Sequence, residues 1–403
     1  PFMKKFYLSS ILIPNLVFSQ QTATQLGSDN VLPAGNNNGS YFGYSVALNS
    51  AGNILAVGAP AASYNAQGAA GKVFIYQYAS NQWSLTGTIT RGVANENFGI
   101  ALDINEAGNI IVVGSPNASN GVGNVMVLEY DGTNWNQKGL LLAGTATSGF
   151  GGSVSINKAG NIIAVGAYGD DTNNITNRGS CSIYQLQGGN WIRIGMILGD
   201  SSDNFGESVS LDSTGFKVAV GAPGDITDNG SVKVFNFNTT TTQWNQIGGD
   251  VPGAQQSANF GHKVELNDAG TVFVVGANER DFANTNEGQV LVYSLINNTW
   301  TPIKAFMGAP GDELGGGVAM NRTGSIIATG AIGHDNRKGT IRVYNANDNW
   351  AQAFADIDGE ANNDESGFAL SMNSSGDVIA IGSPLNDQGG ADNGIVEVYS
   401  LKI

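Results

Sequence analysis

The sequence is poor in the residues that build disulfides, metal centres and positively charged surfaces. Its 403 residues include one cysteine, two histidines and 18 lysines and arginines, against 33 aspartates and glutamates. Cys181 has no second cysteine to pair with, so packing and hydrogen bonding must stabilise the fold. The formal net charge of -15 makes nucleic acids and anionic membrane surfaces unfavourable partners.

Long hydrophobic runs are also absent. The apolar stretch from Phe6 to Phe18 is too short to span a bilayer, and no later stretch replaces it. This stretch follows Lys4 and Lys5, and Val17-Phe18-Ser19 at its end supplies a cleavage pattern with a small residue, as in a secretion signal. The sequence therefore predicts a signal peptide over residues 1–20, a secreted or cell-surface location and no transmembrane segment.

Glycine, in contrast, is abundant, and much of it belongs to a repeat. The stretch FGYSVALNSAGNILAVGAP, residues 42–60, has six related copies farther along the chain. The seven units lie 52 to 56 residues apart and begin at Phe42, Phe98, Phe150, Phe205, Phe260, Leu314 and Ser366. Such a period indicates one small structural unit per copy, stacked against its neighbours.

Each copy contains short β-rich segments joined by turn sequences. Residues 45–49 and 53–60 flank a turn from Asn49 to Gly52, and residues 71–78 alternate between two faces. Asn can hydrogen-bond the backbone two residues on, and Gly can adopt the positive φ that closes a hairpin. A fourth β-rich segment follows a tryptophan, as after Trp135. All six tryptophans occupy this position, which favours a ring wedged between adjacent sheets: Trp83, Trp135, Trp191, Trp244, Trp300 and Trp350.

Seven such units predict an all-β fold, a seven-bladed β-propeller over residues 21–403 with four antiparallel strands per blade. The last copy stops after its third strand, whereas Gln25 to Asp29 is similar to Gln246 to Asp250 of a fourth strand. We therefore expect the N-terminal strand to close the last blade, with Ala23 at the tryptophan position. Cys181 aligns with Val73 on a strand, which predicts a buried structural thiol.

The repeated motif resembles the FG-GAP repeats of integrin α-subunit propellers and of many secreted bacterial proteins. Phe42-Gly43 with Gly58-Ala59-Pro60 and Phe205-Gly206 with Gly221-Ala222-Pro223 carry the resemblance. It implies the propeller fold but not one function, because a fold hosts many activities. Many relatives hold calcium in the first hairpin loop. The corresponding loops here, such as NSAGN and NEAGN, have at most one carboxylate each, so we predict no metal there.

Antiparallel connectivity predicts that the two ends of the ring differ. Loops between strands one and two and between three and four lie at one end, whereas the variable loops between strands two and three lie at the other with the links between blades. That second end carries nineteen acidic residues against five basic ones. Variable loops on a rigid frame are where binding usually resides.

These acidic loops are the predicted binding surface, with a protein or glycan as the partner and a basic partner favoured by charge. Solubility alone is the alternative explanation of the charge. We expect no cofactor, although calcium could bind at these loops. The candidate binding residues are Asp170, Asp171, Asp200, Asp203, Asp225, Asp228, Asp281, Asp312, Asp335, Asp387 and Asp392.

Catalytic signatures are weak. His262 and His334 have no metal-ligand spacing and no nucleophile motif beside them. The sequence thus predicts a secreted binding or adhesion module that is not an enzyme. Two alternatives stay open: a polysaccharide-active hydrolase that uses two carboxylates near the central opening, and a structural subunit of an extracellular assembly.

Overall fold

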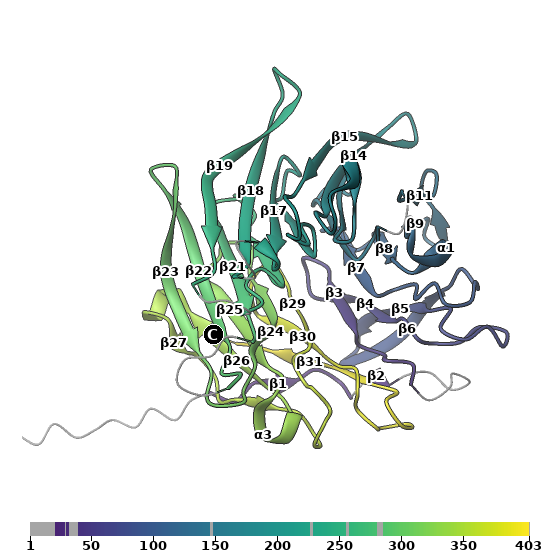
Figure 1. Ribbon diagram of the computed structural model, residues 1–403. Coiled ribbons are helices and arrows are strands. Elements are labelled where there is room, and N and C mark those ends of the chain that lie inside the picture. Colours follow the sequence, from purple (N-terminus) through teal and green to yellow (C-terminus); the bar gives the residue numbers. More distant parts are fainter. Residues whose placement is uncertain are drawn as a thin grey trace, which may run out of the picture.

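The computed structural model describes residues 21–28, 30–31, 39–145, 148–225, 229–254, 258–279 and 285–402. The predicted signal peptide, residues 1–20, lies outside them. Seven antiparallel sheets of four or five strands stand in a ring, which confirms the predicted seven-bladed propeller (Figure 1). Within the described ranges, no helix is long and apolar enough to cross a bilayer.

The innermost strand of each blade is short and borders the ring axis. These strands are β3 (Ser45–Leu48), β7 (Ala101–Ile104), β12 (Ser153–Ile156), β16 (Ser208–Leu211), β20 (Lys263–Leu266), β24 (Leu314–Met320) and β29 (Ala369–Met372). The second strands carry the Gly-Ala-Pro part of the repeat or its variants. They are β4 (Ile54–Ala59), β8 (Ile110–Ser115), β13 (Ile162–Ala167), β17 (Lys217–Ala222), β21 (Val272–Ala277), β25 (Ile326–Ala331) and β30 (Val378–Ser383).

The two outer strands complete each sheet. The third strands are β5 (Lys72–Ala79), β9 (Asn124–Tyr130), β14 (Ser180–Gln187), β18 (Ser231–Asn238), β22 (Gln289–Ile296), β26 (Thr340–Asn345) and β31 (Ile395–Ser400). The fourth strands are β6 (Gln82–Ile89), β10 (Trp135–Gln137) with β11 (Leu142–Ala143), β15 (Asn190–Leu198), β19 (Gln243–Pro252), β23 (Thr299–Met307) and β27 (Ala351–Gln352) with β28 (Ile357–Asp358). Helical turns are confined to loops: α1 (Ala118–Gly121), α3 (His334–Arg337), η1 (Thr172–Asn174) and η2 (Ala346–Asp348).

The N-terminal segment closes the ring as predicted. Strands β1 (Thr24–Gln25) and β2 (Asn30–Val31) both pair antiparallel with β31, so the last blade takes its outer strand from the start of the ring (Figure 1). Ala23 packs at the position that tryptophan holds elsewhere, beside the buried Leu401. Both ends of the ring therefore share one sheet.

Glycine contacts between blades explain why the two halves of the motif recur together. In every blade the glycine after the Phe, Leu or Ser that opens the motif has a φ between +89° and +104°, which favours glycine. Its carbonyl oxygen lies against the Gly-Ala-Pro glycine of the preceding blade. A Cβ atom on Gly166 or Gly221 would come within 1.9 Å of the oxygen of Gly206 or Gly261, respectively. Gly382 meets Gly43 in the same way, so this contact also closes the ring.

The hydrophobic core is divided among the seven interfaces between sheets. Phe98 is fully buried among residues of its own blade and residues of the blade before, such as Val73 and Ile75. Cys181 is fully buried in the equivalent layer, as predicted, and burial raises its pKa to about 12. The core thus consists of one type of interface repeated around the ring.

The tryptophans pack between blades, as predicted. The indole of Trp191 is 6% exposed, lies against Gly139 of the preceding blade and donates a hydrogen bond to the Lys138 carbonyl at 2.8 Å. Trp300 makes the same contacts with Gly248 and the Ile247 carbonyl, at 2.9 Å. A glycine in the outer segment of the preceding blade leaves space for five of the six indoles, and the exception is Trp350.

The first hairpin turns form the end of the ring that we call the turn face. Gly52 has a φ of +69°, as predicted for the end of the turn. The Asn49 side chain reaches farther than predicted: its Oδ1 accepts from the N–H groups of Asn53 (3.0 Å) and Ile54 (2.9 Å), four and five residues on. The longer reach satisfies the two N–H groups where the second strand begins.

A closed ring of seven backbone hydrogen bonds joins these turns. The residue after each Asn or Asp donates its N–H to the carbonyl of its counterpart in the next blade, with N···O distances from 3.0 to 3.4 Å. The residues are Ser50, Glu106, Lys158, Ser213, Asp268, Arg322 and Ser374, and the last donates to the first. The opposite end, formed by the loops between second and third strands and the links between blades, is called the loop face below.

Candidate functional site

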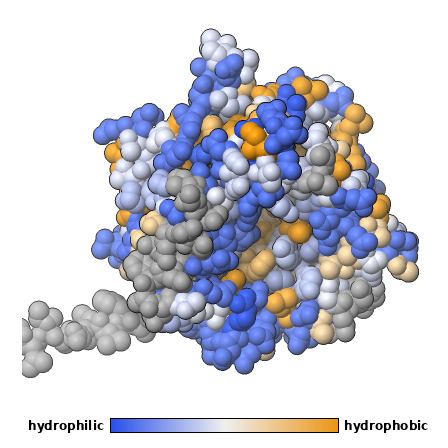
Figure 2. All heavy atoms as spheres, in the orientation of Figure 1, coloured by the Kyte–Doolittle hydropathy of each residue, from blue (hydrophilic) through white to orange (hydrophobic). Residues whose placement is uncertain are grey.

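A channel follows the ring axis and is lined by the inner strands. Three cavities follow one another along it, with volumes of about 200 Å³ at the loop face, 290 Å³ in the middle and 130 Å³ at the turn face. Neighbouring cavities share lining residues, among them Lys263 and Glu265. Figure 2 shows the centre of the ring hollowed, with hydrophobic residues inside the hollow and hydrophilic residues around it.

The loop-face end of the channel, here called the channel mouth, takes its character from one position of the repeat. This position directly follows the glycine with positive φ, and in five of the seven blades it carries a side chain. It is occupied by Tyr44, Ile100, Gly152, Glu207, His262, Gly316 and Phe368. Repeated residues on both sides hold this position in place, while its own side chain differs from blade to blade.

Aromatic and charged groups meet at the channel mouth. The rings of Tyr44 and Phe368 lie 4.9 Å apart between centroids, and the Lys263 amine lies 5.9 Å from the centre of the Phe368 ring. On the neighbouring blades, His262 Nδ1 lies 2.7 Å from Glu207 Oε1. Burial lowers the pKa of Lys263, and the attraction of Glu207 offsets only part of that effect.

Two carboxylates line the middle of the channel. Asp103 accepts hydrogen bonds from the N–H groups of Ile104 and Ile156, both at 2.8 Å, and Glu265 accepts from the N–H of Met320 at 2.9 Å. Burial raises the pKa of Asp103 to about 6 and that of Glu265 to about 8, and the charge of Asp103 adds to the shift of Glu265.

These carboxylates belong to a pattern that joins neighbouring blades. Ser210 Oγ accepts from the Leu266 N–H at 2.9 Å, and Ser371 Oγ accepts from the Leu48 N–H at the same distance. In five blades, the third residue of the inner strand thus supplies an oxygen to an N–H on the next blade: Asp103, Ser155, Ser210, Glu265 and Ser371. The carboxylates replace serines in a structural pattern.

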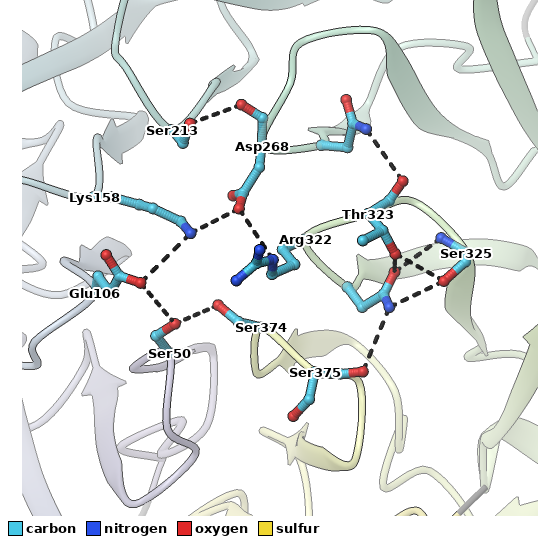
Figure 3. A network of polar contacts seen from close by, with 12 residues as sticks. Ser50, Glu106, Lys158, Ser213, Asp268, Arg322, Thr323, Ser325, Ser374 and Ser375 are labelled. Atoms are coloured by element: carbon cyan, nitrogen blue, oxygen red, sulfur yellow. Dashed lines mark hydrogen bonds and ion pairs between the residues drawn. The ribbon is translucent and has the colours of Figure 1, made fainter.

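Charged residues of the turns cross the turn-face end of the channel (Figure 3). Lys158 Nζ lies 2.7 Å from Asp268 and 3.5 Å from Glu106, and Arg322 Nε lies 3.8 Å from Asp268. Ser50 donates to Glu106 at 3.4 Å and is joined to Ser374. Acidic and basic groups on these turns therefore compensate one another across the axis.

Comparison with known families agrees with this architecture. Residues 135–184 match the family model described as FG-GAP repeat. The chain contains an FG-GAP repeat within a seven-bladed β-propeller. The matched segment starts on β10, the outer strand of one blade, and ends on β14 of the next, so the sequence unit is offset from the blade by one strand. No curated protein matches the chain.

Four of the predicted binding residues are buried in the loop-face framework. Asp170 is 4% exposed and accepts from the Thr172 N–H at 2.8 Å and from Ser180 Oγ at 2.6 Å. Asp225 lies 3.1 Å from Lys233 Nζ, and Asp203 lies 3.6 Å from the same amine. The carboxylates of these residues are engaged with the protein's own loops.

Asp312 is bonded to three different residues. It accepts from the Ala309 N–H at 2.9 Å, from His334 Nδ1 at 2.8 Å and from Arg342 at 3.0 Å. Burial raises its pKa, but these bonds outweigh burial and leave it below the usual value. Asp312 lies two residues before the Phe, Leu or Ser that opens each repeat. The residue at this position is buried in every blade: Ser40, Glu96, Ser148, Asp203, Ala258, Asp312 and Asp364.

Five other predicted residues are exposed on the loop face. They are Asp171, Asp200, Asp335, Asp387 and Asp392. Asp387 accepts from the Asp392 N–H at 3.0 Å, and the Asp200 side chain is 85% exposed and lies 3.8 Å from Lys233. Asp228 and Asp281 lie outside the described residues. Over the part of the chain that the structure describes, no three Asp, Glu, His or Cys side chains gather as a metal ion requires.

Sequence reasoning missed the residues of the channel mouth and the channel carboxylates. The available signal was the register of the repeat, because aligned copies place Glu207, His262 and Phe368 at one position and Asp103 and Glu265 at another. Both positions carry residues that depart from their neighbours in the alignment. Their common location on the axis became visible only once the blades were arranged in a ring.

Proposed function

We propose that the protein is a secreted or cell-surface binding module whose loop face docks a protein or glycan partner. One observation carries this proposal: the loop face gathers loops that differ between blades, exposed carboxylates and the channel mouth on one rigid ring. The FG-GAP propeller fold, which is typical of binding modules, supports it. Five exposed aspartates favour a partner with basic groups, because opposite charge steers association.

A charge comparison between the two faces tests this proposal. Asp171, Asp335 and Asp387 are changed to Asn on the loop face. A matched variant removes three negative charges from the outer strands and the turn face, at Glu129, Asp348 and Asp377. Binding to a cationic probe, chitosan hexamer, and to its uncharged relative, chitin hexamer, is measured by biolayer interferometry at two salt concentrations.

The loop-face variant should bind chitosan hexamer more slowly, by about tenfold in association rate at low salt, and added salt should reduce the difference. The matched variant should behave like the wild type. Equal losses in both variants, or equal binding of the two probes by the wild type, would contradict docking at the loop face. Calcium at the acidic loops stays a prediction, which a thermal melt with and without calcium checks.

We propose binding rather than catalysis. A hydrolase needs two carboxylates free to act on the substrate. Asp103 and Glu265 are the pair on the axis, and both already accept backbone hydrogen bonds that join neighbouring blades. Incubation with a polysaccharide panel should release no reducing ends. Release that disappears in Asp103→Asn or Glu265→Gln would favour the hydrolase.

A further inference from the structure

The Lys263 amine at the channel mouth lacks a hydrogen-bond acceptor. It contacts the ring of Phe368, and no acceptor within hydrogen-bond distance is found for it among residues 21–402 as far as they are described. The Lys263 side chain is half-buried and lines the cavity, so no described acceptor of the protein competes with a ligand for its amine. The amine is therefore available to a ligand that enters the mouth.

Glu207 offers the complementary group. Its Oε1 is bonded to His262, whereas Oε2 accepts no hydrogen bond from any described residue. Lys263 and Glu207 line the same cavity, and the negative charge of the Glu207 carboxylate raises the pKa of Lys263 against the effect of burial. The mouth thus presents a free donor and a free acceptor together.

An apolar surface borders these two groups. Tyr44 and Phe368 form an aromatic pair, and Val264, Val318 and Leu370 continue the wall inward. The cavity of about 200 Å³ is smaller than the roughly 300–1,000 Å³ of sites for drug-sized ligands. It has room for a ligand of about one ring.

These features select among ligand chemistries. A simple anion would be attracted by Lys263 but repelled by Glu207. A simple cation would be attracted by Glu207 but repelled by Lys263. A hydroxyl group can accept from Lys263 and donate to Glu207. A sugar ring combines several hydroxyls with an apolar face suited to an aromatic side chain.

We propose that the channel mouth binds the terminal pyranose ring of a glycan, with Lys263 and Glu207 on its hydroxyls and Phe368 with Tyr44 on its apolar face. This rests on the proposed binding function and names the partner as a glycan. The ring enters end-on from the loop face, because Glu106, Lys158, Asp268 and Arg322 cross the other end of the channel.

Isothermal titration calorimetry with methyl glycosides of glucose, galactose, mannose and N-acetylglucosamine tests the inference. At least one should bind with a millimolar Kd. Lys263→Met and Phe368→Ala should each weaken that binding by about tenfold or more. Lys263→Met should not lower the melting temperature, since it removes a charge that folding desolvates.

Two variants serve as matched controls. Lys304 lies over Phe306 on an outer strand, with 5.5 Å from its Nζ to the ring centre, so Lys304→Met removes the same kind of contact outside the channel. Tyr130→Ala removes an exposed aromatic ring at the end of β9. Both should bind the sugar as the wild type does.

Three outcomes would overturn the inference. The first is no heat with any of the four glycosides, and the second is binding that survives both channel substitutions. The third is equally strong binding of acetate or tetramethylammonium, which would indicate a simple ion site. If the sugars fail while loop-face charge still controls chitosan binding, the proposed function stands and only the channel site is lost.

Discussion

The two faces of this ring are built from the same repeats, but the turns of one face are uniform in length and bonding, whereas the loops of the other differ in sequence. On the turn face, seven turns of equal length are joined by a closed ring of hydrogen bonds, and Glu106, Lys158, Asp268 and Arg322 compensate one another. On the loop face, buried aspartates fix the bases of loops that differ in sequence. Of the five exposed aspartates there, only Asp200 has an ion pair with a described residue, Lys233. The uniform turn face thus holds the ring together, while the residues of the loop face can differ from blade to blade.

The comparison also separates carboxylates by role. Asp312 is buried and bonded to a backbone N–H, a histidine and an arginine, whereas Asp387 is exposed in a loop. Both belong to the acidic excess of the loop face. Changing Asp312 would break bonds to three other residues, whereas the described side-chain bond of Asp387 stays within its own loop, to the Asp392 N–H. Charge counts alone therefore do not identify a binding surface.

The largest expected effect is on the framework shared by both faces. Gly221→Ala should reduce the free energy of unfolding by about 3 kcal/mol or more, because its Cβ would lie 1.9 Å from the Gly261 oxygen and backbone cannot move aside cheaply. Urea denaturation measures the change. Gly68→Ala, in an open loop with no atom within 4 Å of the new Cβ, is the control and should be nearly neutral. Equal stability of the two variants would refute the glycine contact as the basis of the repeat.

A turn-face substitution should come next in size. Asn157→Ala removes the acceptor of the Asn161 and Ile162 N–H groups and should cost about 2–3 kcal/mol in urea denaturation. Asn157→Asp keeps an acceptor oxygen, as Asp212 does in the next blade, and should cost less. The prediction fails if alanine and aspartate are equally tolerated.

The channel between the faces should show a pH-dependent effect. Glu265 has a pKa of about 8 when folded, against 4.5 as the ordinary value, so the native state holds the proton more tightly than the unfolded chain. Ionisation therefore costs native stability as pH rises from about 4.5 to about 8. Glu265→Gln should match the wild type near pH 4.5 and exceed it by about 2 kcal/mol above pH 8, less than the full shift because channel solvent screens the charge.

Urea denaturation across this pH range measures the difference, with Glu129→Gln on an outer strand as a control for losing one carboxylate. A stability difference that does not grow with pH would show that Glu265 is well solvated in the channel. The channel would then not differ from the two faces in how well solvent reaches its carboxylates.

The smallest expected effect is an increase in the free energy of unfolding. Ala319 stands where Ser210 supplies an oxygen to the Leu266 N–H, so Ala319→Ser should give the Met372 N–H an acceptor and add about 0.5–1 kcal/mol. Ser210→Ala should lose about 1 kcal/mol. Thermal melts of the two variants measure these changes. The prediction is wrong if both substitutions move the melting temperature in the same direction.

Much of the fold was predictable because it is encoded locally and repeated. The positions of Asn49 and Gly52 identify a hairpin, and seven copies of that hairpin identify the propeller. Gln25 to Asp29 identified the closing strand because its partner sequence is visible in another blade. The site was less predictable, since Asp170 and Asp387 look alike in sequence while one is buried and the other exposed.

The amino-acid sequence by itself determined the number of blades, the way the ring closes and the turn geometry, because each depends on short stretches whose glycines, asparagines and tryptophans act on their immediate neighbours. Only the tertiary structure decided which side chains meet on the axis. Lys263 and Phe368 lie on different blades, and Asp103 and Glu265 likewise. Their proximity follows from the closure of the ring, which no local pattern contains.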